Sequence, residues 1–405
     1  MIKIGYSSAD ITPDRDAALI GYEFRRSELP AGNAGVLDPL NLKAFVLDSP
    51  AGPAVLVALD LCIIEPDLAR HWRKIAAEAA GTVPEKVIIS CSHTPSGPFP
   101  RMGKGGDKAS IGKSSNRVVT EAEACAEYTV RVETTLKGTV AAAAGLLLPY
   151  SISWNQAPLG LGYNRRVISP AGLRQCWNPQ EQHDLMPGPS PDPQFTLLVA
   201  RQLNGPREII LWGHGAHPVV LGKTSRMLSA DWPGCACRML EAGHPYRYTG
   251  FFLGACGNIH PWIATQDNAA GVGVVGGCAA AFAELIVHGA FPMGETEATI
   301  ETAADTITLG GVELDLAVWR WGGLWIAAVP VELFAELGAA LRKQFDAPLF
   351  LISNANGWTG YWPHAAAFAE GGYEIDAARA MGRNPGDGEK LIEAVVTLAQ
   401  IIKDA

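Results

Sequence analysis

Short apolar runs alternate along the chain with longer segments in which apolar residues recur every three to four positions. The first pattern is typical of buried strands and the second of helices with one buried face. The expected strands span 2–6, 43–48, 54–61, 86–90, 195–201, 208–212, 250–253, 324–329 and 349–353. The expected helices span 67–80, 121–144, 232–241, 272–287, 332–344 and 388–403. This alternation predicts an α/β fold with mixed β-sheets flanked by helices.

Two long segments show neither the strand pattern nor the helix pattern. Residues 99–116 are rich in Gly, Lys and Ser and come directly after an expected strand, and residues 157–193 contain many Pro and Gly residues. Long irregular segments in a compact domain are usually lids or binding loops or are disordered. We expect both to be lids or substrate-binding loops, with ordinary surface loops as the alternative.

The composition allows a large core. The chain has 405 residues, of which 48% are hydrophobic and 18% charged, and we expect a single domain spanning 1–405. Its net charge of -9 and the lack of a dense Lys/Arg run argue against nucleic-acid binding. We see no signal-peptide pattern and expect Gly, Pro or charged residues to break every apolar tract before it reaches membrane-spanning length.

The cysteines indicate a reducing compartment. Eight cysteines in a chain of this length do not form a disulfide scaffold, and several lie within apolar runs, where cysteine behaves as a small buried hydrophobe. A cytoplasmic location is therefore expected.

Four histidines each follow an apolar run that is expected to be a strand: His93, His214, His217 and His260. Open α/β sheets bind ligands at the carboxyl ends of their strands. Neutral imidazoles, a carboxylate and an open position for water are what a hydrolytic zinc site needs. His214 and His217 are three residues apart, so on an extended segment they face opposite sides and at most one is a ligand, unless the glycines beside His214 bend the chain.

Two carboxylates also follow apolar strands. Glu332 comes after the run 324–329 and is expected to open a helix, where it either binds the metal or simply complements the helix dipole. Asp60 ends the run 54–60 and is a natural partner for the second ring nitrogen of a ligand histidine.

The segment SHTPSGP at 92–98 resembles the SHTHSGP motif of the neutral/alkaline ceramidases, which are zinc amidases that cleave N-acylsphingosine. Further segments resemble motifs of this family in the same order. They are GVLDPL at 35–40, NR at 164–165, AHP at 216–218, SAD at 229–231, GACGNIHP at 254–261, VPVE at 329–332 and GGYE at 371–374. Because they span nearly the whole chain, the sequence is identified as a member of the ceramidase-like superfamily.

The resemblance implies a ceramidase-like catalytic domain with a zinc ion, Zn(2+), held by His93, His217, Glu332 and Tyr373. It selects His217 over His214 as the ligand. It also implies that Arg165 lies near the reacting carbonyl, where a guanidinium stabilises an oxyanion.

The chain departs from the family in three places. The position of the catalytic serine is His260, and the aspartate two residues earlier is Asn258, a candidate partner or alternative ligand like His214. The sequence also ends soon after 391–401, so we expect no C-terminal β-sandwich domain. A long-chain lipid is then a weaker expectation than a small polar or sugar-like molecule.

The leading hypothesis is a zinc-dependent hydrolase that cleaves an amide, ester or lactone carbonyl, with His260 as general base or as a donor to the tetrahedral intermediate. The alternatives are a zinc-dependent isomerase or lyase, a true N-acylsphingosine amidase, and a protein that binds its ligand without turnover. The expected partner is a small-molecule substrate. The eleven tryptophans also suggest a homo-oligomer.

Overall fold

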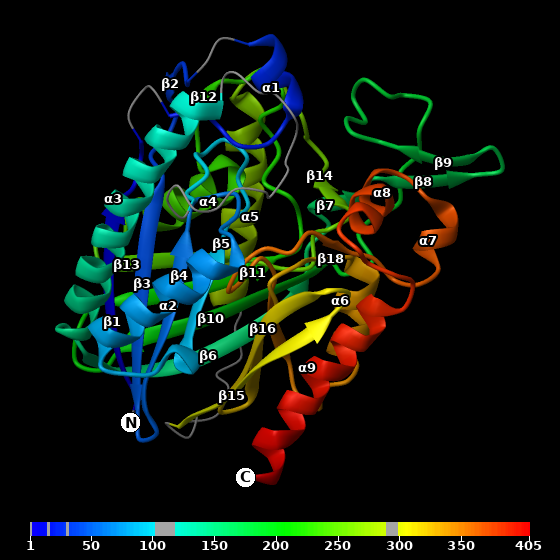
Figure 1. Ribbon diagram of the computed structural model, residues 1–405. Coiled ribbons are helices and arrows are strands. Elements are labelled where there is room, and N and C mark those ends of the chain that lie inside the picture. The colour runs from blue at the N-terminus through cyan, green and yellow to red at the C-terminus, as the bar shows by residue number, and fades with distance from the viewer. Residues whose placement is uncertain (1, 14–16, 30–31, 102–117, 289–298) are drawn as a thin grey trace.

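The computed structural model describes residues 2–13, 17–29, 32–101, 118–288 and 299–405. Within them the same succession of elements occurs three times: three strands, a helix, a fourth strand and a second helix (Figure 1). The expected α/β fold with mixed sheets is confirmed.

The three units have these bounds. The first contains β1 (Lys3–Asp10), β3 (Asn41–Ser49), β4 (Gly52–Leu59), α2 (Pro66–Ala80), β5 (Val87–Cys91) and α3 (Val118–Ala144). The second contains β6 (Leu148–Pro158), β10 (Gln194–Gln202), β11 (Glu208–His214), α4 (Asp231–Glu241), β13 (Arg247–Leu253) and α5 (Ala270–His288). The third contains β15 (Ile300–Leu309), β16 (Val312–Trp321), β17 (Leu324–Ala328), α6 (Ala335–Arg342), β19 (Leu349–Ile352) and α9 (Asp387–Asp404).

Strand pairing is the same in all three units. The first three strands are antiparallel neighbours, and the fourth runs parallel to the third after a helical crossover: α2 between β4 and β5, α4 between β11 and β13, and α6 between β17 and β19. The first two units share one eight-stranded sheet, joined between β1 and β6 through the pairs Lys3↔Pro149 and Ile4↔Leu148. The third and fourth strands of each unit therefore end on the same side.

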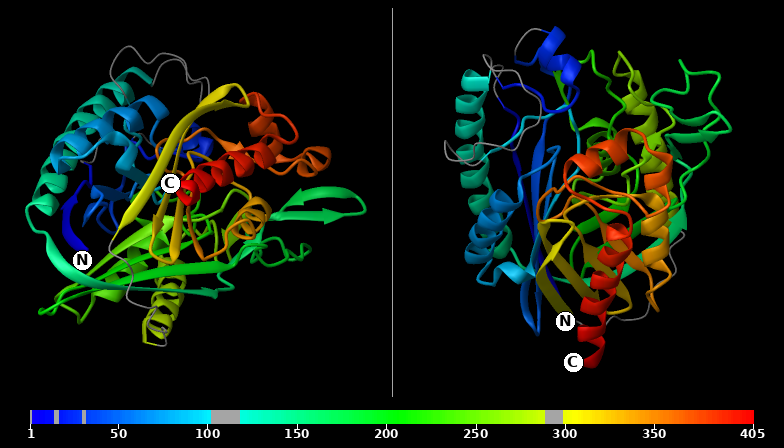
Figure 2. Two further views of the ribbon diagram at one scale, coloured as in Figure 1. Left: turned by 90° about the horizontal axis from the view of Figure 1, so that it is seen from below. Right: turned by 45° about the vertical axis from the view of Figure 1, so that its right-hand side comes forward.

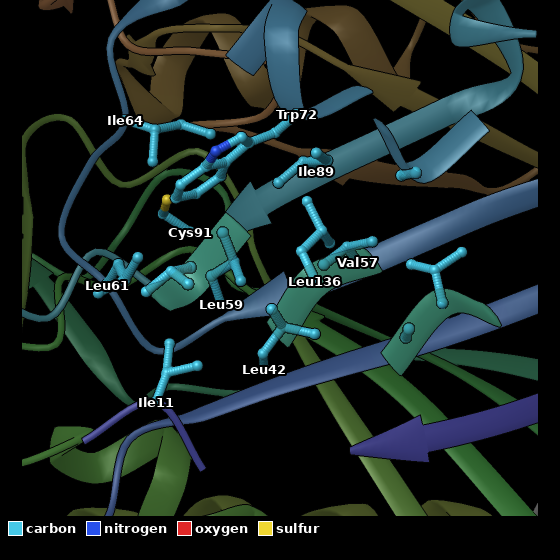
Figure 3. Close-up of a cluster of buried hydrophobic side chains, with 14 of the residues drawn as sticks. Ile11, Leu42, Val57, Leu59, Leu61, Ile64, Trp72, Ile89, Cys91 and Leu136 are labelled. Atoms are coloured by element: carbon cyan, nitrogen blue, oxygen red, sulfur yellow. The ribbon is translucent and has the colours of Figure 1, made fainter. Parts of the chain in front are cut away.

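A common core lies between the units. It contains side chains from both halves of the eight-stranded sheet and from the four-stranded sheet, including Phe45, Phe252 and Phe350. Each outer face is covered by a helix pair: α2 and α3, α4 and α5, or α6 and α9 (Figures 1 and 2). Under the first pair, Trp72 and Leu136 pack on Leu42, Val57 and Ile89 (Figure 3). Each such buried side chain contributes about 1.5–3 kcal/mol.

Helix α5 differs from the sequence expectation. By length and composition it is apolar enough to cross a membrane, whereas every apolar tract was expected to be too short. About half of this helix is buried, and residues such as Val272, Val275 and Ala279 pack in the core formed with α4. Packing between the helix pair and the sheet accounts for the apolar residues on the buried side of α5, while Val274 and Leu285 are exposed.

Short elements lie outside the three units and include several at the strand ends. They are α1 (Glu23–Glu28), β2 (Gly35–Val36), the 3₁₀ turn η1 (Pro84–Lys86), β7 (Gly162–Asn164), β8 (Arg166–Ser169), β9 (Gly172–Gln175), β12 (Met227–Leu228), β14 (Ile259–Pro261), β18 (Glu332–Leu333), β20 (Tyr361–Trp362), α7 (Ala367–Glu370) and α8 (Tyr373–Ala380). The segment 157–193, expected to be irregular, contains β7 and the β8–β9 hairpin, which projects from the body of the molecule (Figure 2). Most of 99–116 lies outside the described residues.

Gly213 of β11 allows the units to approach closely. A Cβ at this position would overlap the ring of Phe350 on β19 and the carbonyl oxygen of Phe252 on β13. We predict that Gly213→Ala lowers the free energy of unfolding by about 1–3 kcal/mol through overpacking, as measured by urea denaturation. Gly273→Ala in α5, where a Cβ meets no atom within 4 Å, is the control and should be neutral or slightly stabilising. Equal effects of the two substitutions would contradict this account of the packing.

Candidate metal centre

Strand ends from all three units meet at one buried cluster. His93 follows β5 of the first unit, His217 follows β11 of the second, and Glu332 follows β17 of the third. The ligand atoms of these three side chains all lie within 4.8 Å of one another. The sequence expectation that strand-end histidines and a carboxylate come together is thus fulfilled for these three residues.

His93 is held by the loop that follows β4. Its backbone has φ 74°, in the left-handed region, and its N–H donates to the carbonyl of Leu61. The ring Nδ1 lies 2.9 Å from the carbonyl oxygen of Cys62. Because a carbonyl only accepts, the proton is on Nδ1, and in the neutral ring Nε2 presents a lone pair. Strained residues persist where the surrounding structure enforces them, often at functional sites.

His217 is fixed in the same way by the second unit. Its Nδ1–H donates to the carbonyl of Ile259 at 2.9 Å, so its Nε2 also presents a lone pair. The Nε2 atoms of His93 and His217 lie 3.3 and 3.1 Å from the same oxygen, Oε2 of Glu332. All three side chains are buried.

Glu332 does not begin a helix, contrary to the sequence expectation. It lies in β18, whose residues Glu332 and Leu333 pair with Tyr361 and Trp362 of β20, and α6 begins only at Ala335. This pairing keeps the chain extended past the end of β17. The second carboxylate oxygen, Oε1, accepts the indole N–H of Trp358 at 2.7 Å.

The cluster fits a divalent cation. Burial alone would lower the pKa of His93, but the Glu332 carboxylate raises that pKa well above its usual value. In contrast, the pKa of His217 is lowered to about 4, mainly by burial and then by the charge of Arg165. Glu332 thus favours a positive charge beside its Oε2, either a proton on His93 or a cation, while His217 directs a lone pair at the same oxygen. One cation satisfies both contacts, and ligand atoms about 2.0–2.1 Å from a tetrahedral zinc lie roughly 3.3 Å apart, close to the observed separations.

Arg165 and His260 form a polar wall beside this cluster. The Nη1 of Arg165 donates to Nε2 of His260 at 2.7 Å, and Nδ1 of His260 faces the carbonyl of Trp177 at 3.3 Å. The ring of His260 lies 5.7 Å from that of His217. Burial and then Arg165 hold the pKa of His260 well below its usual value. His260 is thus neutral, and its basic nitrogen, Nε2, already accepts a hydrogen bond from Arg165.

Glu374 anchors the guanidinium of Arg165. Its Oε1 accepts Nε of Arg165 at 2.6 Å, and its Oε2 accepts Nη1 of Arg166 and Nε2 of Gln175. Glu374 is fully buried. Burial would raise its pKa, but Arg165 keeps the pKa below its usual value. This network ties Arg165, which lies between β7 and β8, together with β8 and β9 to α8.

Tyr373, which the resemblance implies as a ligand, begins α8 and is 49% exposed. Its ring lies 5.6 Å from that of Tyr361 and 5.8 Å from the guanidinium carbon of Arg165. It therefore borders the polar wall. Its role as a fourth ligand stays a prediction.

The three other candidates lie elsewhere. Asp60 accepts the backbone N–H of Asn41 and lines a separate cavity of about 180 Å³ beneath α4; the partner of His93 Nδ1 is instead the Cys62 carbonyl. His214 points its Nδ1 at the carbonyl of Gln194, and its Nε2 has no hydrogen-bond partner among the described residues. Burial lowers the pKa of His214 to about 4.

Asn258 acts on α6. Its amide oxygen accepts the N–H of Ala335, and its amide nitrogen donates to Glu336, whose other oxygen accepts from Asn164. Asn258 therefore fixes the start of α6, three residues after Glu332.

Several groups that shape the site were not predicted from the sequence. The carbonyls of Cys62 and Ile259 orient the imidazoles, but backbone groups carry no side-chain signal. Trp358 and Tyr361 reach the site through contacts between distant segments. Glu374, next to Tyr373, was part of a matched motif without an assigned role. Two asparagines with left-handed backbones before Trp358 were the available local signal for a constrained turn.

No protein-family model matches the sequence, and no curated protein resembles it. Its structure is similar to that of a ceramidase complexed with C2, with a TM-score of 0.79 and 16% sequence identity, covering 100% of this chain and 75% of the other. A neutral ceramidase from Pseudomonas aeruginosa gives a TM-score of 0.76 at 16% identity, covering 100% and 74%. The chain has the ceramidase fold.

The half-buried position of Asp60 predicts a pH-dependent stability. Burial raises the pKa of its carboxyl to about 6, although Lys43 opposes the rise. The folded state thus binds a proton that the unfolded chain releases between about pH 4 and 6, so stability decreases as pH rises through this window. We predict that Asp60→Asn gains on the order of 1–2 kcal/mol relative to wild type between about pH 4 and 7.

Urea unfolding across this pH range measures the difference. Asp305→Asn, which removes an exposed carboxylate on β15, controls for the loss of one negative charge. A stability difference between Asp60→Asn and wild type that does not change with pH would refute the assigned titration.

Proposed function

We propose that this protein is a metal-dependent hydrolase that cleaves an amide, ester or lactone carbonyl. The observation that carries the proposal is the pair of imidazole Nε2 atoms facing one buried carboxylate oxygen at 3.1 and 3.3 Å. The ceramidase fold supports this proposal, since a structure described as a neutral ceramidase aligns with this chain over its whole length.

Zinc is the proposed metal, with His93, His217 and Glu332 as ligands and Tyr373 as the candidate fourth. Two neutral imidazoles and a carboxylate form a donor set typical of hydrolytic zinc. A zinc ion bound here supplies Lewis acidity, which lowers the pKa of water towards roughly 7 and polarises a carbonyl. The remaining steps depend on the residues of the chain.

Arg165 binds the substrate oxygen in this proposal. Its guanidinium already donates through Nε to Glu374, through Nη1 to His260, and through Nη2 to the Gly257 carbonyl and the Tyr361 hydroxyl. One Nη1 hydrogen remains without a partner among the described residues. A preorganised donor of this kind stabilises developing negative charge, because it does not have to reorient during the reaction.

His260 positions Arg165 and does not take up the proton of water. Its Nε2 is the acceptor for the guanidinium, so acting as a base would require breaking that bond and placing a second positive charge beside Arg165. This proposal replaces the general-base role that the sequence suggested for the same position.

A small polar substrate suits this wall. Trp177 is 36% exposed and its ring lies 5.1 Å from the Arg165 guanidinium carbon, so an aromatic face and charged donors border the same space. Such a combination favours a compact polar or sugar-like molecule. N-acylsphingosine is the alternative substrate.

We predict that activity is lost on chelation and restored by one equivalent of zinc. The assay uses p-nitrophenyl esters, N-acyl anilides, lactones and N-acylsphingosine in water labelled with ¹⁸O. A hydrolase places the label in the carboxylate product, whereas an isomerase or lyase releases product without it. His93→Ala should abolish zinc binding, and His71→Ala, a histidine on the exposed face of α2, should not. Full activity of the chelated protein would rule out the proposal.

Substitutions of His260 distinguish positioning from base catalysis. His260→Ala removes the acceptor for Arg165 and should lower kcat/KM at least about a hundredfold. His260→Gln supplies an amide oxygen as acceptor and should recover most of the loss, because a glutamine cannot act as a base but can hold the guanidinium. Thermal unfolding verifies that both variants fold. If the Gln variant is as inactive as the Ala variant, His260 has a proton-transfer role.

A further inference from the structure

The segment that follows β19 is attached to the strand that leads to His93. Asn354 accepts the N–H of Cys91 through its carbonyl, and Asn356 exchanges two hydrogen bonds with the backbone of Ile89 at 2.7 and 3.1 Å. Asn354 and Asn356 both have left-handed backbones, with φ 47° and 61°. The third unit therefore extends the edge of β5, and the chain continues directly to Trp358.

Trp358 connects two metal-ligand positions. Its indole N–H donates to Oε1 of Glu332 at 2.7 Å, which is the carboxylate oxygen that does not face the imidazoles. Its ring packs with Ile63, Phe99 and Cys62, whose carbonyl orients His93. The same side chain thus contacts the carboxylate ligand and the loop behind an imidazole ligand.

We infer that Trp358 is a positioning residue of the metal centre, which holds Glu332 so that only Oε2 faces His93 and His217. A carboxylate turns readily about its last side-chain bond, and a donor fixed to one oxygen selects a single orientation. The inference rests on the metal centre of the proposed function. It adds a residue that neither the ligand set nor the sequence motifs contain.

Packing alone does not require this hydrogen bond. Trp72, Trp154, Trp212, Trp319 and Trp321 are buried tryptophans whose indole nitrogens lack hydrogen-bond partners among the described residues. Trp358 is less buried than these, and yet its N–H meets a buried carboxylate at short distance. An indole can thus be buried in this fold without an acceptor for its N–H, although Trp232, Trp325 and Trp362 also have one.

The test is Trp358→Phe, which keeps the aromatic packing and removes the N–H. Zinc affinity is measured by competition with a chromophoric chelator, and the variant should bind about 10–100-fold more weakly than wild type. The Co²⁺-loaded variant should also show shifted d–d absorption bands, which report ligand geometry. Trp325→Phe is the matched control, because Trp325 also donates to a carboxylate, Asp346 at 3.0 Å, but lies on β17 away from the cluster.

Unfolding of the metal-free proteins separates positioning from stability. Trp358→Phe with weakened zinc binding and an unchanged metal-free unfolding midpoint supports the inference. Zinc affinity within about twofold of wild type and an unchanged Co²⁺ spectrum overturn it. If Trp358→Phe does not fold, Trp358→Leu, which also lacks a donor, is measured by the same criteria. Wild-type protein that binds no zinc would overturn the proposed metal centre itself, a result distinct from equal binding by variant and wild type.

Discussion

The site depends on one electrostatic constraint: two imidazole Nε2 atoms face one carboxylate oxygen in a buried place, where a proton or a cation is needed to make both contacts favourable. Backbone carbonyls fix the proton of each ring on Nδ1, so neither His93 nor His217 can relieve the contact with Glu332 by changing tautomer. Unpaired buried charge is costly, and a bound cation removes the cost. The left-handed backbone of His93 and the pairing of β18 with β20 both maintain this arrangement.

The threefold succession of elements explains how residues so distant in sequence meet. In each unit the third and fourth strands end side by side, because a crossover helix makes them parallel neighbours. The loops after these strands supply a carbonyl and His93 in the first unit, His217 and another carbonyl in the second, and Glu332 with Trp358 in the third. The same topological positions thus supply different chemical groups.

Much of this was predictable from the sequence, because apolar periodicity reflects burial. Most strands with buried residues on both faces and the amphipathic helices were identified. Strand-end placement indicated His93, His214, His217 and His260 as candidates, and only the resemblance selected His217 over His214. In contrast, β6, β15 and β16 were missed. Many residues of β6 and β15 are exposed or half-buried, so neither has a dominant apolar run, and charged residues interrupt the apolar run of the buried β16. Glu332 was expected in a helix because local patterns contain no information on its pairing with Tyr361, which is fixed by contacts between distant segments.

His260 lies at the position where the resemblance implies a serine, and its hydrogen bonds affect more than one side chain. A serine hydroxyl both donates and accepts, whereas the neutral imidazole here accepts from Arg165 and donates towards the Trp177 carbonyl, which uses both of its nitrogens. Glu374 balances part of the guanidinium charge from the other side. Among the described residues, the guanidinium of Arg165 thus has one N–H without a partner, so the proposed contribution of the polar wall is to hold a substrate oxygen in place while other groups exchange protons.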